Sequence, residues 1–236
     1  MVALIHVLLV GVLAAVLALF LGASGPSCPS PEDIQTDYVK AHFNLQKFQG
    51  VWYEAAYHDW TQPISVCGCM RSVKHYRPEV KHIFDNFTLH CQGDHYFANL
   101  TFDLTGKSIG HMTGRWNLGP IQLIAIPNTV VAVGVDVTTG EYEWVIEYQC
   151  VEVWKHVLFA GVNFYHRHRD VPSEVLQSLI SIARQQGIGY WLDHGLGITV
   201  VDHSNCTYPP IDEEVTTRLN QDASKQQDIK LKEDSA

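Results

Sequence analysis

The stretch FQGVWYE at residues 48–54 decides the fold, because it opens the first of a series of short strands. Gly50 is followed by an aromatic and apolar run over residues 51–58, a composition typical of a strand. Short strands joined by short turns lie antiparallel to their neighbours, so the sequence predicts an all-β barrel or sandwich of eight or nine strands. The further runs of this kind, separated by turn residues, are 71–76, 83–91, 95–104, 109–116, 121–126, 130–137, 142–150 and 157–166.

One helix follows these strands. Asp170 or Ser173 is placed to cap its start, Pro172 suits its first turn and Gly187 suits its end. Its apolar positions recur at spacings of three and four residues, which gives a single apolar stripe. We therefore expect the helix to pack outside the sheet, and a last short strand over 198–201 to follow it. The stripe consists of Val175, Leu176, Leu179, Ile180, Ile182 and Ala183.

The two ends of the chain differ from its middle. Residues 2–21 carry no charged side chain and lead into small residues, so we expect 1–24 to be a secretory signal peptide. The apolar run is also long enough to span a bilayer, and a retained signal anchor remains an alternative. Residues 211–236 are polar and acidic and contain no aromatic residue, which predicts a disordered tail. One domain over 28–210 remains.

Charge, cysteines and sequons limit the classes of function. The net charge is −9 and the basic residues are scattered, which argues against nucleic acid as a partner. All 6 cysteines follow the apolar leader and no pair of CxxC motifs occurs, so we expect disulfides and no metal site. His166 and His168 are too few for a metal without a third ligand. The Asn-X-Thr sequons at Asn86, Asn99 and Asn205 predict N-glycosylation in an extracellular protein.

Three motifs, in this order, resemble those of the lipocalin family, and within it the apolipoprotein D type. Gly50-Val51-Trp52 resembles the Gly-X-Trp motif of the first strand. Asp136 lies in a segment similar to the Thr-Asp-Tyr turn, with valine on both sides in place of Thr and Tyr. Arg167 stands where the family has an arginine just before its helix. The resemblance covers 28–210 and implies an antiparallel up-and-down barrel with one C-terminal amphipathic helix packed outside.

The resemblance also implies a role for Gly50, Trp52, Asp136 and Arg167, which would close one end of the barrel. A barrel of about eight strands encloses room for one small ligand, and an open base would let the cavity drain. In the family the guanidinium stacks on the indole, a cation–π contact of about 2 kcal/mol when desolvated. We expect Trp52 and Arg167 to form this pair.

For the cysteines, the resemblance implies two disulfides that hold the ends of the chain, one from Cys28 to Cys150 and one from a cysteine after the first strand to Cys206. Three cysteines near the second strand compete for the remaining places. A hairpin with its turn near Glu79 favours one assignment, and a slip of one residue would exchange two of the partners. The assignment is then Cys28–Cys150, Cys67–Cys91 and Cys69–Cys206.

The alternation of side chains predicts which residues line the cavity. In the strands expected over 142–150 and 157–166 one parity is apolar, whereas the other includes Glu147 and Gln149, which prefer water. We expect the apolar parity to bind the ligand, although the helix could cover it instead. An apolar cavity with Tyr and Trp tips fits a sterol, retinoid, bilin, carotenoid or fatty acid. The expected lining residues are Trp144, Ile146, Tyr148, Val162 and Phe164.

The resulting prediction is a secreted, non-catalytic lipocalin that binds and transports a small hydrophobic ligand, with no cofactor and no defined oligomeric state. One alternative is a lipocalin-domain enzyme acting on a lipid or carotenoid, de-epoxidase-like or isomerase-like, because the chain also resembles the lipocalin domain of violaxanthin de-epoxidase. Val66 and Gly68 stand beside the cysteines where that family has a catalytic Asp, which argues against it. A second alternative is a protein that binds no ligand and acts as an interaction partner, anchored in a membrane by residues 2–21. Residues 69–82 extend the apolipoprotein D pattern by either a strand or a lid loop.

Overall fold

The computed structural model describes residues 26–62, 67–91, 93–104, 108–117, 125–195 and 197–211. The signal peptide expected at 1–24 lies outside the described residues, as does the tail expected at 211–236 apart from its first residue. Among the described residues, no helix has both the length and the apolar character needed to cross a bilayer.

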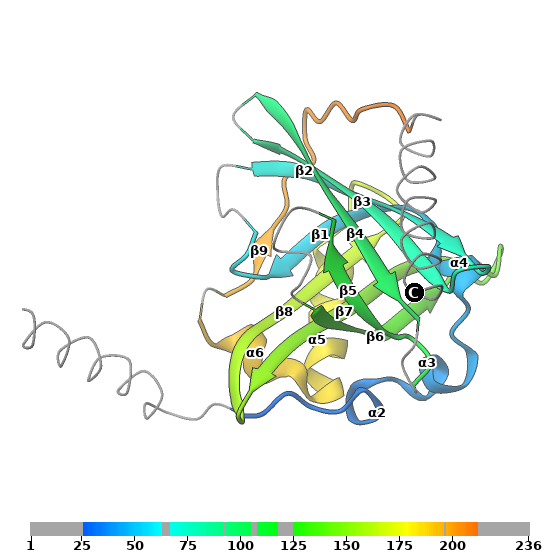
Figure 1. Ribbon diagram of the computed structural model, residues 1–236. Helices are drawn as coiled ribbons and strands as arrows, with labels where there is room; N and C mark the ends of the chain where they lie inside the picture. Colours follow the sequence, from blue (N-terminus) through cyan, green and yellow to red (C-terminus); the bar gives the residue numbers. More distant parts are fainter. Residues whose placement is uncertain are drawn as a thin grey trace, which may run out of the picture.

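The strands form a closed antiparallel barrel, as the sequence predicts (Figure 1). Strands β1 to β8 pair in sequence order, and β1 closes the barrel by pairing with both β8 and β2. A short β9 pairs with β1 beyond this closure. The strands are β1 (Gly50–His58), β2 (Cys67–Arg77), β3 (His82–Cys91), β4 (Asp94–Asp103), β5 (His111–Trp116), β6 (Ala125–Val135), β7 (Tyr142–Val153), β8 (His156–His166) and β9 (Thr199–Val200).

Strands β6 and β2 differ from, or decide between, the expectations for these parts of the chain. The separate strands expected at 121–126 and 130–137 are wrong, because residues 125–135 form the one strand β6. Pro127 suggested a break, since proline is unusual inside a strand, yet it lies within β6 opposite Thr113 of β5. Of the two alternatives for residues 69–82, the strand is correct and the lid is wrong, because they form most of barrel strand β2 and its turn into β3.

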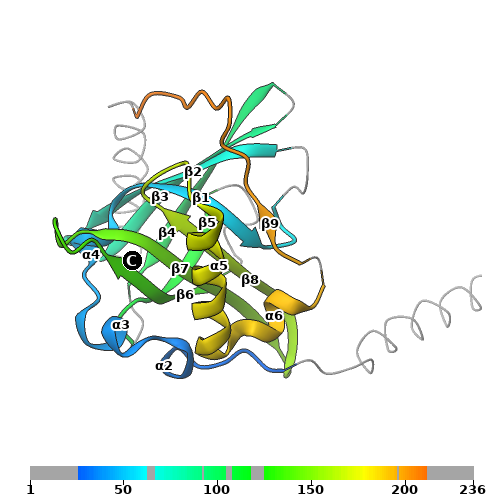
Figure 2. The ribbon, with the colours of Figure 1, turned by 180° about the vertical axis from the view of Figure 1, so that it is seen from behind.

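Helix α5 (Ser173–Ala183) packs against the outer wall of the barrel, as expected (Figure 2). Four residues of its apolar stripe are buried and Val175 and Ile182 are partly buried, whereas its other side faces solvent. Pro172 occupies the N-cap and no side chain caps the helix, so the capping role expected of Asp170 or Ser173 is wrong. Gly187 has a φ of +85°, a left-handed conformation that glycine adopts without strain, and it separates α5 from α6 (Gly189–Asp193).

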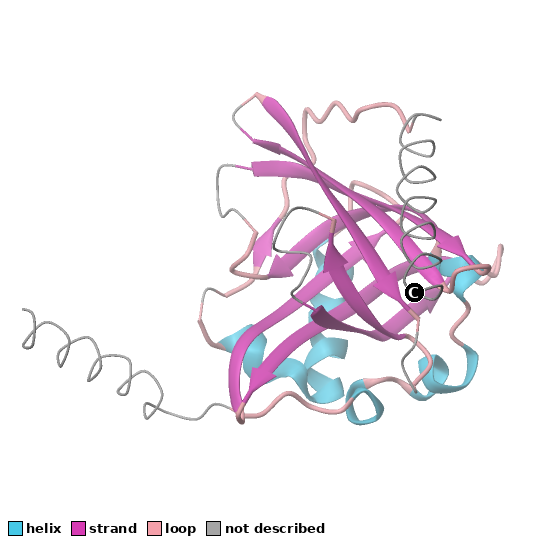
Figure 3. Ribbon diagram, in the orientation of Figure 1, coloured by secondary structure: helices cyan, strands magenta, loops and turns pink. Residues whose placement is uncertain are grey.

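The chain before β1 carries three short helices: α2 (Pro31–Ile34), α3 (Asp37–His42) and α4 (Leu45–Phe48). The side chain of Asn44 accepts hydrogen bonds from the first amides of α4, which fixes the start of that helix. Helix α4 leads directly into β1 and carries Phe48 beside Trp52. All the helices lie at the periphery of the barrel (Figure 3).

The buried apolar side chains form two clusters on opposite sides of the barrel wall. One cluster lies between the outer faces of β6, β7 and β8 and helix α5. The other contains Phe48, Trp52, Met112, Val130 and Val145 and fills the end of the barrel nearest α4. Strands β7 and β8 therefore have a buried residue on both faces along most of their length.

Candidate functional site

Trp52 and Arg167 lie against each other near the point where α4 leads into β1. Trp52 is fully buried, and its Nε1–H donates a hydrogen bond of 2.7 Å to the carbonyl oxygen of Phe48. The guanidinium carbon of Arg167 lies 3.5 Å from the centroid of the Trp52 ring, which places the cation flat against the indole.

Arg167 also joins three segments of backbone at this end. Its Nη1 donates to the carbonyl of Val51 at 2.6 Å, and its Nε donates to that of Tyr142 at 3.0 Å. Its Nη2 donates to the carbonyls of Lys47 and Gln49 at 2.8 and 2.9 Å. Burial lowers the pKa of Arg167 to about 10, so the group remains charged at neutral pH.

Gly50 and Asp136 support the same end in different ways. Gly50 has a φ of +97°, and a Cβ there would lie 3.3 Å from Arg167 Nη1, so glycine admits the guanidinium closely. Asp136 is partly exposed, and its Oδ1 accepts hydrogen bonds from the amides of Thr138 and Thr139. It therefore shapes the turn between β6 and β7 rather than contacting Trp52 or Arg167.

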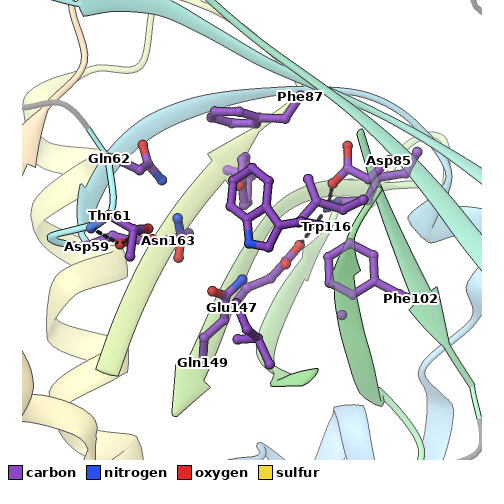
Figure 4. Close-up of a pocket in the computed structure, with 15 residues that line it drawn as sticks. Asp59, Thr61, Gln62, Asp85, Phe87, Phe102, Trp116, Glu147, Gln149 and Asn163 are labelled. Carbon is purple, nitrogen blue, oxygen red and sulfur yellow. Dashed lines mark hydrogen bonds and ion pairs between the residues drawn. The ribbon is translucent and has the colours of Figure 1, made fainter. Parts of the chain in front are cut away.

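The barrel interior holds a cavity of about 60 Å³ (Figure 4). Part of the wall is apolar, with Phe87, Leu100, Phe102, Trp116 and Ile126. The rest of the wall consists of Gly114, Tyr165 and the polar side chains Asp59, Thr61, Gln62, Lys74, Asp85, Glu147, Gln149 and Asn163.

A buried ion network crosses the cavity. The Nζ of Lys74 lies 2.7 Å from Asp85 Oδ2 and 3.3 Å from Glu147 Oε1. Ser72 donates to the second oxygen of Asp85, and Asn128 donates to the second oxygen of Glu147. Burial alone would lower the pKa of Lys74, but the two carboxylates reverse this effect and raise it, so the ammonium group stays charged.

A second polar group lies beside this network. Glu54 on β1 is fully buried, and its Oε1 accepts hydrogen bonds from Asn163 Nδ2 at 2.6 Å and Gln62 Nε2 at 3.1 Å. Burial raises the pKa of Glu54 to about 8 despite these hydrogen bonds, so the carboxyl is protonated at neutral pH. Burial also raises the pKa of Asp59. Asn163 pairs across the strands with Glu147, which joins the two polar groups.

The five residues expected to line the cavity lie on the opposite face of the wall. Their side chains belong to the apolar cluster under α5 and do not line the cavity, so this prediction is wrong. The helix needs an apolar surface to bury its stripe, and the apolar parity of β7 and β8 supplies it. The misplaced residues are Trp144, Ile146, Tyr148, Val162 and Phe164.

The polar residues of the cavity were missed because their parity suggested solvent. Glu147 and Gln149 stand at alternate positions of β7, and Asn163 stands opposite Glu147 on β8. The amphipathic helix is the signal that could have identified them. Because α5 covers the apolar outer face of β7 and β8, the polar alternate residues of these strands face the interior. Lys74 and Asp85 stand opposite each other in the observed register of β2 and β3.

The structure places the cysteines in three disulfides and gives the sequon asparagines different exposures. The structure joins the three pairs assigned from the sequence, and no described cysteine is free. Asn205 is exposed, whereas Asn86 is buried and its Nδ2 donates to Asn99 Oδ1 at 2.7 Å. Among the sequons, Asn205 is therefore the most accessible side chain.

A closed meander of eight strands, a Trp–Arg pair at one end and one helix on the outer wall define the lipocalin fold. No protein-family model and no curated protein sequence matches the chain. Similar solved structures are apoproteins of crustacyanin, which are lipocalins. Apocrustacyanin C2 has a TM-score of 0.57 at 14% identity, covering 78% of this chain and 92% of that chain. Lobster apocrustacyanin A1 and apocrustacyanin C1 each have a TM-score of 0.56 at 12% identity, with the same coverage.

Proposed function

We propose that this chain is a secreted, non-catalytic lipocalin of the apolipoprotein D type that holds a small, largely hydrophobic ligand inside its barrel. The observation that carries the proposal is the interior cavity, which has an aromatic wall and lies above the base formed by Trp52 and Arg167. Ligand pockets of this kind combine apolar walls with a few polar groups that fix orientation.

The driving force for binding is burial of apolar ligand surface against Phe87, Phe102 and Trp116. Each square ångström removed from water contributes about 25 cal/mol. The Trp52–Arg167 pair supports binding indirectly, because a sealed base keeps the cavity dry and the walls in place.

The size of the cavity restricts the ligand classes. Sterols, retinoids, bilins, carotenoids and fatty acids occupy pockets of roughly 300–1,000 Å³, well above the 60 Å³ of this cavity. A ligand of these classes would place only one end in the cavity, unless the side chains around Trp116 move. The proposal therefore favours the smallest members, or ligands that project from the barrel.

Secretion is supported by three disulfides and by the apolar leader, and Asn205 is our choice for N-glycosylation. The non-catalytic assignment is supported by the cysteines, since a disulfide sulfur is not a nucleophile. The similar structures are named as apoproteins, that is, as proteins without a bound group, which fits a carrier. Turnover of a lipid or carotenoid by the purified protein would favour the enzyme alternative instead.

Native mass spectrometry of the secreted protein tests the proposal. We expect a co-purifying small molecule that is lost on denaturation and whose binding quenches Trp116 fluorescence, with Trp116→Phe removing the signal. Phe87→Ala in the cavity should weaken binding, whereas Phe164→Ala under α5 should leave the affinity of the folded protein unchanged. Equal effects of the two variants on affinity, or a barrel that retains no molecule and binds none of the ligand classes above, would contradict the proposal.

A further inference from the structure

The polar side of the cavity contains more hydrogen-bond acceptors than the protein satisfies. Three buried oxygen atoms have no hydrogen-bond partner in the described residues: Glu54 Oε2, Gln62 Oε1 and Asn163 Oδ1. Gln62 and Asn163 line the cavity, and the exposed fraction of Asn163 is only 3%. A buried acceptor without a partner costs about 1–3 kcal/mol, so this group of oxygens has a chemical preference for donors.

The orientation of the two amides is fixed by Glu54. The nitrogen atoms of Gln62 and Asn163 both donate to Glu54 Oε1, which leaves their oxygen atoms turned away from that carboxyl oxygen. Figure 4 shows Asp59, Thr61, Gln62 and Asn163 gathered on one side of the cavity, with Glu147 beside Asn163. The acceptors therefore form one cluster rather than isolated sites.

The cavity is also short of positive charge. Lys74 is the one basic side chain among the described residues that line it, and its ammonium group is already paired with Asp85 and Glu147. Asp59 lines the same cavity, and Glu54 lies in hydrogen-bond contact with the lining residues Gln62 and Asn163. Buried carboxyl groups without a cation are costly when ionised, so they either hold a proton or accept a cation from elsewhere.

We propose that the ligand carries a protonated amine, which binds among Glu54, Asp59, Gln62 and Asn163, with its apolar body against Phe87 and Trp116. The proposal rests on the proposed function and names the ligand class. An ammonium group has three N–H donors and no acceptor, which complements the free oxygens of Gln62 and Asn163 and the Glu54 carboxylate that forms once its proton is displaced. Aromatic rings beside the site add attraction for the cation. A carboxylate ligand would meet like charge and unpaired acceptors, so the site discriminates against it.

Calorimetric titration with three molecules of similar shape tests the ligand class. We expect 2-phenylethylamine to bind at least about tenfold more tightly than 2-phenylethanol, because hydrogen bonds to a charged group are the stronger ones. Phenylacetate should not bind. If the alcohol or the carboxylate binds as well as the amine, the proposal of an amine ligand is overturned.

Two variants locate the amine, and a third is the control. Glu54→Gln and Asp59→Asn should each reduce the affinity for the amine about tenfold or more and leave that for the alcohol little changed. Glu79→Gln removes an exposed carboxylate in the turn between β2 and β3 and should change neither affinity. Retained amine preference in both cavity variants would overturn the proposal, and a circular dichroism melt of each variant shows that it is folded.

Proton release gives a readout that a purely structural role for Glu54 would not produce. Glu54 holds a proton at pH 7, because burial raises its pKa to about 8, and a bound ammonium would displace that proton. Titration in two buffers of different ionisation enthalpy should reveal up to about one proton released per amine bound, and none in Glu54→Gln. Amine binding without proton release would overturn the placement at Glu54. The groups that face Glu54 or its backbone are Tyr57, Asp59, Gln62, Glu147, Asn163, Tyr165 and His203.

The outcomes separate this inference from the proposed function. If none of the three molecules binds while native mass spectrometry finds a neutral lipophile in the barrel, the amine ligand is overturned and the carrier function stands. If neither kind of molecule is bound, both proposals are overturned.

Discussion

The two faces of strands β7 and β8 have opposite chemistry, although they are formed by alternate residues of the same segments. The outer face is apolar, with Ile146 and Phe164 packed under α5. The inner face is polar, with Glu147 opposite Asn163. The difference teaches that the apolar parity of a barrel strand does not by itself indicate the ligand side, because an external helix requires an apolar surface as well.

The two faces also contribute to stability by different physical effects. The outer face removes apolar surface from water, at about 25 cal/mol per Å². The inner face places charges where water is scarce, and its desolvation cost is offset only while every charge keeps its partner. Substitutions on the inner face should therefore depend on charge and pH, whereas those on the outer face should depend on volume.

The largest effect is expected from Lys74→Met, which leaves Asp85 and Glu147 without their cation. Breaking a buried ion network in this way costs about 3–5 kcal/mol of unfolding free energy. Urea denaturation measures the change. The variant Lys74→Met/Asp85→Asn/Glu147→Gln removes all three charges and should recover most of the loss. A triple variant as unstable as the single one would show that volume rather than charge governs the inner face.

On the outer face, Leu179→Ala should reduce the unfolding free energy by about 3 kcal/mol, because it removes a fully buried side chain of α5 and leaves a cavity. The loss should be the same at pH 5 and pH 8, unlike any change on the inner face. Gln177→Ala, on the exposed side of the same helix, is the control and should have little effect. A pH-dependent loss for Leu179→Ala would contradict the separation of the two faces.

Per pH unit, a smaller effect is expected from the buried carboxyl of Glu54, which makes stability depend on pH. Burial raises the pKa of Glu54 from its ordinary value of 4.5 to about 8. Between these values the folded protein holds a proton that the unfolded chain has lost, so the unfolding free energy falls as pH rises from about 5 to about 8, by up to about 1.4 kcal/mol per unit. Glu54→Gln has no proton to lose and should flatten this slope. The same slope in wild type and variant would assign it to another group.

The smallest effect is expected from Asp136→Asn, which lies on neither face. The partly exposed carboxylate accepts two amide hydrogen bonds in the turn between β6 and β7, which lower its pKa. An asparagine oxygen can accept both, so thermal unfolding should shift only slightly and ligand affinity should not change. A loss of affinity would mean that this turn contributes to the base of the barrel more directly than its contacts suggest.

Local patterns predicted the strand order and the base of the barrel, whereas the cavity could not be predicted. The motif around Trp52 and the position of Arg167 depend on residues near each other along the chain or at fixed places in the family pattern. The polar network depends on residues from distant strands, such as Lys74 and Glu147. Neither segment alone shows that these two charges pair with each other. Where both faces of a strand are buried, alternation no longer distinguishes inside from outside. The prediction of two separate strands in place of β6 failed for a local reason, because Pro127 is an unusual residue inside a strand.

The hydrogen bonds of Arg167 have a consequence for the order in which the protein folds. Its guanidinium donates to carbonyl groups 116 to 120 residues earlier in the chain. Along the sequence, six strands lie between β1 and β8, although the two are neighbours in the barrel. Contacts of such long range form slowly, because the entropy of a large loop is lost before the contact can stabilise it. The base of the barrel can therefore form only after β8 has been synthesised and has met β1. A nascent chain that stops before Arg167 should remain open at this end and vulnerable to proteolysis, however complete its first seven strands are.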